Sequence, residues 1–199
     1  MRIISGWARG RRLFSPAPKD QQIRPTADRA REALFSILGT QVQNARILDL
    51  FAGTGALGLE AMSRGAARIV FVDLGQTALQ LIKKNVAICL TGRPAHEEMI
   101  DIIRHDLSRG LTSLCNSDRL SGQFDLIFLD PPYGKGLAQK ILTELASTSL
   151  IHDHTIIMAE ETADITLPEQ ADHLHLIDQR QYGDSGFWFY RPQGQGATI

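Results

Sequence analysis

The chain has 199 residues, of which 43% are hydrophobic and 22% charged, and its formal net charge is −1. This length favours one domain, and this composition is typical of a soluble globular protein. No apolar run approaches the roughly 20 residues that span a bilayer, and the N-terminus lacks the apolar stretch of a secretory signal. Cys89 and Cys115 lack metal-ligand spacing, so we predict no metal site and a cytoplasmic location.

The predicted elements alternate between strands and helices after an irregular hairpin in residues 1–24. In chain order we expect a helix over 26–38, a strand over 46–50, a helix over 56–62, a strand over 68–73, a helix over 76–90, a strand over 100–104, a short helix over 108–116, a strand over 124–129, a helix over 137–147, a strand over 155–159 and a hairpin over 173–191. This alternation predicts a Rossmann-like α/β fold with seven strands, mostly parallel, and a C-terminal antiparallel hairpin. The predicted parts are a basic N-terminal arm (1–24), the main domain (25–192) and a frayed tail (193–199).

Charge is distributed unevenly along this chain. Residues 1–31 hold eight basic and two acidic residues, a net charge of +6, which leaves −7 for the remainder. A basic segment on an acidic body favours a polyanionic partner docked at one edge, although a solvated basic tail would have the same composition. Arginines near Trp7 suit RNA, through phosphate contacts and stacking, although Trp7 could equally pack on the body. The predicted RNA contacts are Arg9, Arg11, Arg12 and Arg24.

A glycine-rich turn follows the first strand. Gly53, Gly55 and Gly58 fit the pattern G-x-G-x-x-G, which lets the backbone pass close to a ligand and lets a helix pack on a strand. Asp49 lies inside the strand end, four residues before the first glycine. A carboxylate there suits a ligand with a cationic amine better than a pyrophosphate, whose negative charge it would repel.

Four acids end or follow successive predicted strands: Asp49, Asp73, Asp106 and Asp130. Because the carboxyl ends of parallel strands share one edge of a sheet, these side chains are expected at the edge where such sheets bind ligands. Asp73 lies 20 residues beyond Gly53, an offset at which an acid accepts hydrogen bonds from ribose hydroxyls in nucleotide-binding α/β folds.

The stretch Asp130-Pro131-Pro132-Tyr133 follows the fourth strand. Two prolines stiffen the backbone and remove N–H donors, which leaves the Asp130 carboxylate and carbonyl oxygens as acceptors. Such a site suits a planar base with an exocyclic amine, with Tyr133 stacking on the ring. Asp130 would orient the amine, stabilise charge and act as a candidate proton acceptor. We predict Asp130, Pro131 and Tyr133 as the catalytic residues.

These features together resemble a class I methyltransferase that binds S-adenosylmethionine. The N-terminal pieces Arg2-Ile3-Ile4-Ser5-Gly6, Arg9-Gly10-Arg11 and Arg24-Pro25-Thr26, the stretch from Leu48 to Gly55 and Asp130-Pro131-Pro132-Tyr133 resemble the RsmD family of 16S ribosomal RNA guanine-N2 methyltransferases. The resemblance covers nearly the whole chain. Leu74-Gly75-Gln76 departs from the charged residues expected after Asp73.

The resemblance implies methylation of guanine 966 (RNA numbering) in the small ribosomal subunit or its assembly intermediate, by a monomer. By the same resemblance Asp49 and the Gly53–Gly55 loop hold the methionine end, Asp73 the ribose and Asp106 the adenine. The residues predicted to bind the cofactor are Asp49, Phe51, Ala52, Gly53, Thr54, Gly55, Asp73, Asp106 and Asp130.

Other functions fit part of the same pattern. An N6-adenine methyltransferase on DNA or RNA would use Asp-Pro-Pro-Tyr equally well, although the chain is short for a DNA enzyme. Protein-glutamine methyltransferases usually carry Asn where Asp130 stands. A non-catalytic RNA-binding assembly factor would not need all four acids, and an NAD-linked oxidoreductase would need a hydride-transfer acid or base that the sequence does not offer beside the pocket.

Overall fold

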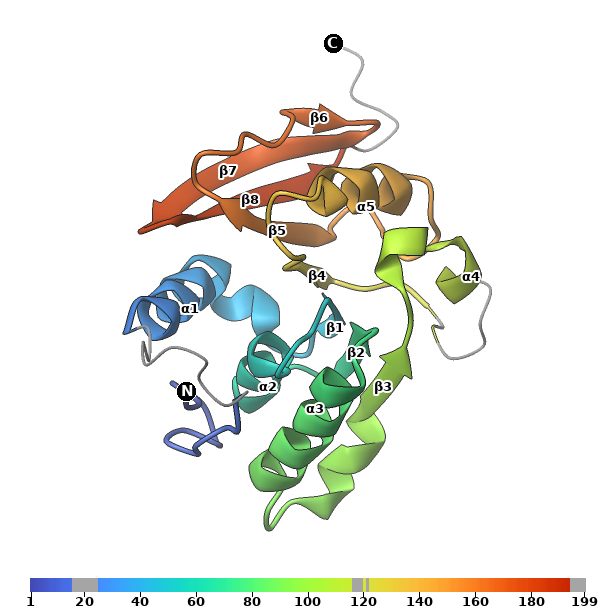
Figure 1. The fold of residues 1–199 in the computed structure, drawn as a ribbon. Coiled ribbons are helices and arrows are strands. Elements are labelled where there is room, and N and C mark those ends of the chain that lie inside the picture. The colour runs from blue at the N-terminus through green and yellow to red at the C-terminus, as the bar shows by residue number, and fades with distance from the viewer. Residues whose placement is uncertain (16–24, 116–119, 121, 194–199) are drawn as a thin grey trace.

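An eight-stranded sheet forms the centre of the computed structural model (Figure 1), which describes residues 1–15, 25–115, 120 and 122–193. Arg24 and residues 194–199 of the predicted tail lie outside the described residues. The helices are α1 (Pro25–Leu38), α2 (Ala56–Ser63), α3 (Gln76–Cys89), α4 (Thr112–Cys115) and α5 (Leu137–Ala146), with 3-10 turns η1 (Gly39–Val42), η2 (Pro94–Met99) and η3 (Leu107–Arg109). The strands are β1 (Arg46–Leu50), β2 (Arg68–Asp73), β3 (Ile100–Arg104), β4 (Leu126–Leu129), β5 (Ile156–Thr162), β6 (Gln170–Ala171), β7 (Leu174–Tyr182) and β8 (Ser185–Pro192).

The strand order is β3-β2-β1-β4-β5-β8-β7-β6, and the first five of these strands are parallel. From β1 the chain builds outward through β2 and β3 on one side and through β4 and β5 on the other. Open α/β sheets bind ligands at such a reversal of strand order, beyond the carboxyl ends of the strands. The topology therefore places the ligand site between the ends of β1 and β4.

Helices cover both faces of the sheet. On one face Phe71 and Phe128 pack against Leu34 of α1 and its neighbours from α2 and α3. On the other face Leu50 and Leu129 pack against α4 and α5. Because both faces are covered, the parallel strands are continuous apolar runs rather than alternating patterns, which is why they were recognisable in the sequence.

The predicted hairpin in the N-terminal segment has one β-bridge, between Arg2 and Arg12. It packs on α2, where the buried Glu60 carboxylate accepts hydrogen bonds from the backbone N–H groups of Ile4 (2.7 Å) and Ser5 (3.0 Å). The segment 1–14 is thus tied to the main domain through a buried charge, which is costly to leave unpaired.

The sheet ends in an antiparallel hairpin of β7 and β8, which lies above α1 in Figure 1. The predicted fold class is confirmed, but the predicted number of seven strands is too low. The additional strand β6 has two residues and pairs with β7, so it depends on tertiary pairing and has no local pattern. Among the described residues, no helix combines the length and apolar character needed to cross a membrane.

Candidate functional site

The loop after β1 adopts an unusual backbone conformation. Phe51 has φ +60° and Gly55 has φ +76°, and a bulky side chain at positive φ is uncommon outside sites that constrain it. A Cβ at Gly58 would lie 2.4 Å from the Phe71 ring, so only glycine lets α2 pack this closely on β2. The glycine pattern therefore serves both the turn and the packing of helix on sheet, as the sequence predicts.

Two of the predicted acids hold this loop in place. Asp49 Oδ2 accepts a hydrogen bond from the Gly58 N–H at 2.9 Å, and Asp73 Oδ2 accepts one from the Gly53 N–H at 2.9 Å. Asp73 Oδ1 also accepts the Gly75 N–H at 2.7 Å. Each carboxylate oxygen has a second lone pair, so these bonds shape the loop and still leave acceptors for a ligand.

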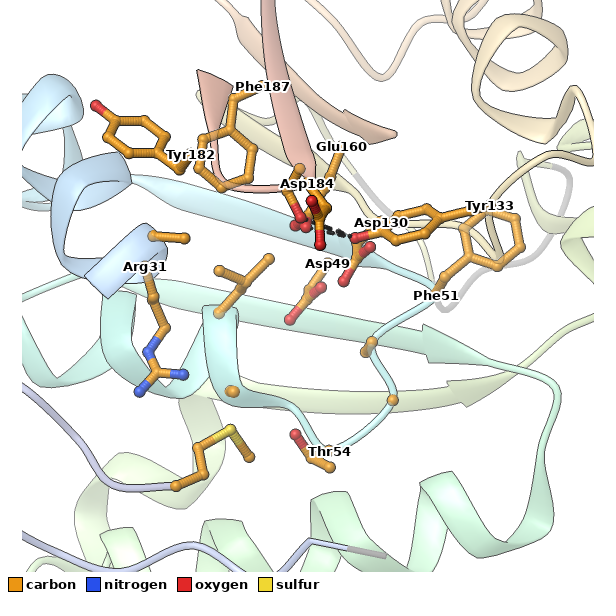
Figure 2. Close-up of a pocket in the computed structure, with 17 residues that line it drawn as sticks. Arg31, Asp49, Phe51, Thr54, Asp130, Tyr133, Glu160, Tyr182, Asp184 and Phe187 are labelled. Atoms are coloured by element: carbon orange, nitrogen blue, oxygen red, sulfur yellow. Dashed lines mark hydrogen bonds between the residues drawn. The ribbon is translucent and has the colours of Figure 1, made fainter. Parts of the chain in front are cut away.

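Strand register brings three carboxylates to one face of the sheet. Asp49 pairs with Phe128, and Leu129 pairs with Ala159, so Asp130 and Glu160 follow as neighbours on adjacent strands. Since side chains alternate along a strand, Asp130 faces the same way as Phe128 and Asp49. In Figure 2 the carboxylates of Asp49, Asp130 and Glu160 lie close together.

Burial and mutual repulsion change the protonation of this cluster. Burial raises the pKa of Asp49 to about 7, the Gly58 hydrogen bond lowers it and the Asp73 carboxylate raises it. Burial also raises the pKa of Asp130 well above its usual range, with Glu160 and Asp49 adding repulsion. The pKa of Glu160 is raised by burial as well. A cluster that resists ionisation in this way is stabilised by a cationic ligand.

The stretch after β4 is fixed against β5 and β8. Tyr133 Oη donates a hydrogen bond to Glu160 Oε1 at 2.6 Å and lies 3.3 Å from Ser185 Oγ (Figure 2). Burial, and then the bond to Glu160, raise the pKa of Tyr133, so its hydroxyl stays a donor. The Gly134 N–H donates to Glu161 Oε1 at 3.1 Å. The tyrosine ring is 40% exposed and therefore available to a ligand.

Two cavities meet at this point. The first, of about 460 Å³, is bounded by Asp49, the loop after β1, α1 and the β7–β8 hairpin. The second, of about 620 Å³, is bounded by Asp73, Leu74 and Asp106. Four residues line both cavities: Phe51, Gly53, Asp130 and Tyr133. The two cavities therefore adjoin at residues that include the predicted catalytic Asp130 and Tyr133.

The second cavity contains the remaining predicted acid. Asp106 is the N-cap of η3, where its Oδ1 accepts hydrogen bonds from the Ser108 hydroxyl (2.6 Å) and N–H (3.1 Å). The hydroxyl bond is the main cause that lowers the pKa of Asp106, so this carboxylate is ionised at neutral pH. Leu74, at the departure from the family pattern, gives this cavity an exposed apolar wall.

The predicted RNA-binding arginines have different environments. Arg11 donates through Nη1 to the carbonyls of Ile88 and Cys89 and through Nη2 to that of Thr91, at the C-terminal end of α3. A cation there is favoured by the helix dipole. Arg9 and Arg12 are exposed.

Trp7 packs on the body of the protein. Its indole N–H donates to the Met62 carbonyl at 3.0 Å, and the Arg93 guanidinium lies 5.0 Å from its ring centroid. Of the two alternatives for Trp7, the structure shows packing.

Several residues of the first cavity do not follow from the sequence pattern: Met1, Arg31, Glu160, Tyr182, Asp184, Ser185 and Phe187. Glu160 lies at the level of Asp130 on the next strand, so the strand-end rule that found the other acids would have found it. Tyr182, Asp184, Ser185 and Phe187 come from the hairpin, whose position over α1 depends on antiparallel pairing far from the site in sequence. Among the described residues, no group of three or more His, Cys, Asp or Glu side chains could hold a metal ion.

Comparison with known proteins identifies the family. The model of the family described as "Conserved hypothetical protein 95" matches residues 1–191. The chain belongs to this family. It is 31% identical to ribosomal RNA small subunit methyltransferase D of Escherichia coli (strain K12), over all of this chain and 93% of that protein. It is 34% identical to YlbH of Bacillus subtilis (strain 168), over 98% of this chain and all of that protein. The predicted membership of the RsmD family is confirmed.

A solved structure agrees with this assignment. That of the Escherichia coli protein yhhF has a TM-score of 0.77 at 29% identity and covers 98% of this chain and 99% of that one. Family membership and this likeness both extend over nearly the whole chain, including the N-terminal segment and the C-terminal hairpin.

Proposed function

We propose that this protein transfers the methyl group of S-adenosylmethionine to the exocyclic N2 amine of a guanine in small-subunit ribosomal RNA, at position 966 by its family resemblance. The observation that carries the proposal is the meeting of two cavities at Asp130 and Tyr133. A donor that extends from Asp106 in the second cavity to Asp49 in the first would carry its methyl group at this junction, where a base that enters the first cavity can reach it. The relatives named as ribosomal RNA methyltransferases support the class of substrate.

The residues present fit S-adenosylmethionine. Asp49 and the loop after β1 would hold its methionine end, Asp73 the ribose and Asp106 the adenine. The raised pKa values of Asp49 and Asp130 support this assignment, because the donor carries an ammonium and a sulfonium that relieve the repulsion between these carboxylates. When bound, the donor supplies an electrophilic methyl group on positive sulfur.

The remaining chemistry belongs to the protein. The lone pair of an exocyclic amine is delocalised into the base, so the amine must be oriented before it can attack. Asp130 accepts a hydrogen bond from the amine and holds its nitrogen toward the methyl group. As the N–C bond forms and the C–S bond breaks, the amine loses a proton. Asp130 is placed to accept it, since its raised pKa makes it a better base than an exposed carboxylate.

The RNA must bring its base out of the stack to reach this point. The first cavity is lined by α1 and by the β7–β8 hairpin, and the base would enter it past Phe187 and Asp184. The exposed Arg9 and Arg12 would bind phosphates of the RNA, and Arg11 would add charge while it fixes the segment to α3. Arg24, which lies outside the described residues, remains a predicted RNA contact from the sequence. The proposed enzyme acts as a cytoplasmic monomer.

The test is to offer labelled S-adenosylmethionine with naked ribosomal RNA, isolated small subunits and DNA, and then to identify the methylated nucleoside. The expected product is N2-methylguanosine at one nucleotide of the small-subunit RNA. N6-methyladenosine in RNA or DNA would establish the alternative enzyme instead. RNA binding without transfer to any of the three would support a non-catalytic assembly factor.

A further inference from the structure

Glu160 is a carboxylate in contact with the predicted catalytic stretch, and neither the predicted site residues nor the family resemblance includes it. It lines the first cavity, follows Asp130 in strand register and has a raised pKa because of burial. Its Oε1 accepts the Tyr133 hydroxyl at 2.6 Å, and a hydrogen bond from the Ser185 side chain also lowers the pKa of this carboxylate. A carboxylate has about four lone-pair sites, so Glu160 can accept a further hydrogen bond from a ligand in the cavity that it lines.

The hydrogen-bonding edge of guanine matches this pair of acids. Its N1–H and its N2 amine are neighbouring donors on one edge of the ring, so the edge presents donors to both Asp130 and Glu160. Adenine presents the opposite pattern beside its N6 amine, because its N1 is an acceptor. A carboxylate placed opposite a lone pair repels it and is itself left unpaired, and sites of this kind reject the mismatched ligand strongly.

We infer that Glu160 is a specificity residue, which accepts the N1–H of the target guanine while Asp130 accepts its N2 amine. This inference rests on the proposed function and adds to it the source of the choice of guanine. Tyr133 has a supporting part, because its hydroxyl donates to Oε1 and fixes the Glu160 side chain at the wall of the cavity. Ser185, which lies 3.3 Å from the same hydroxyl, steadies the arrangement from β8.

The probe that isolates N1 is 2-aminopurine. It keeps the exocyclic 2-amine but has a bare N1 with a lone pair. The substrate is small-subunit RNA carrying either guanosine or 2-aminopurine riboside at the mapped target position, prepared by ligation and reconstituted with ribosomal proteins. The measured quantity is the ratio of kcat/KM for the guanine substrate to that for the 2-aminopurine substrate.

The decisive variant is Glu160→Gln, which keeps the size of the side chain but can offer an amide N–H to N1. Wild-type protein should prefer guanine, and Glu160→Gln should lower the preference by about 100-fold, chiefly by raising activity on 2-aminopurine. A gain of activity on the analogue cannot arise from misfolding, so a damaged variant would not imitate this result. Loss of the O6 atom in 2-aminopurine affects both proteins equally and leaves the comparison intact.

Two control variants separate other roles of Glu160. Tyr133→Phe removes the hydroxyl that donates to Glu160 but keeps the ring. If Glu160 acted only by positioning Tyr133, Tyr133→Phe and Glu160→Gln would have the same ratio of kcat/KM for guanine to kcat/KM for 2-aminopurine. Asp184→Asn removes another carboxylate from the same cavity and tests for a general effect of charge. We expect neither control to raise activity on 2-aminopurine.

An unchanged ratio in Glu160→Gln, with guanine still methylated by wild-type protein, would overturn the inference and leave the proposed function standing. Failure of wild-type protein to methylate the guanine substrate at all would overturn the proposed function itself.

Discussion

Asp49 offers a prediction in which ligand binding and stability change in opposite directions. Its pKa is raised to about 7 from 3.8, chiefly by burial. The unfolded chain therefore ionises this group at lower pH than the folded protein does, so ionised Asp49 destabilises the ligand-free fold. At about 1.4 kcal/mol per pKa unit, the cost reaches roughly 4 kcal/mol above pH 7 and disappears below pH 4.

The variant Asp49→Asn removes this cost and keeps an oxygen that can accept the Gly58 N–H. Without ligand, the free energy of unfolding of Asp49→Asn should exceed that of wild type. This difference should grow by about 2.5 kcal/mol as the pH is raised from 5 to 8. The assay is urea unfolding of both proteins at a series of pH values, followed by circular dichroism. Comparing the two proteins at each pH cancels the titration of groups that they share.

Ligand should narrow this difference in stability. S-adenosylhomocysteine at 100 times its Kd should stabilise wild-type protein by about 2.7 kcal/mol, and it should stabilise Asp49→Asn far less, because the contact to the amino group is weakened. A stability difference that does not vary between pH 5 and pH 8 would refute the reasoning about burial. Equal stabilisation by the ligand would refute the role of Asp49 in binding.

Two further predictions concern the N-terminal segment. Gly6→Ala should lower the free energy of unfolding by about 3 kcal/mol or more, because Gly6 has φ +78° and a Cβ there would lie 1.8 Å from the Ser63 carbonyl oxygen. The matched control is Gly10→Ala, at φ +83° in open space, which should lower the free energy of unfolding by about 1 kcal/mol. Calorimetry measures both changes. Arg9→Ala should weaken RNA binding and reduce the slope of log K against log salt concentration by about 1, with no change in Tm. Arg11→Ala should lower Tm, because it removes the hydrogen bonds from Arg11 to α3. Equal effects of the two variants on Tm would contradict the roles assigned to Arg9 and Arg11.

The parallel part of the fold follows closely from local sequence. The strand predicted at 100–104 has the observed bounds, and the helix predicted at 76–90 ends one residue earlier, at Cys89. These elements are apolar runs or apolar faces bounded by turn residues, so each is determined by its own segment. The four predicted acids also lie where the strand-end rule puts them, since parallel strands share one edge.

Features that depend on pairing between distant segments are not predictable in this way. The strand predicted at 155–159 continues to Thr162 because β8 pairs with it, so its observed end depends on a segment more than 20 residues further along the chain. Composition predicts a basic N-terminal segment, but only the packed structure shows that Arg11 is bound to α3 while Arg9 is exposed. Charge alone cannot distinguish these two environments.

The most direct test of the central claim is a crystal structure of this protein with S-adenosylhomocysteine. We expect the amino-acid end beside Asp49, the adenine in the cavity next to Asp106 and the sulfur at the junction of the two cavities, facing Asp130. Adenine bound between α1 and the β7–β8 hairpin, or sulfur far from Asp130, would contradict this claim.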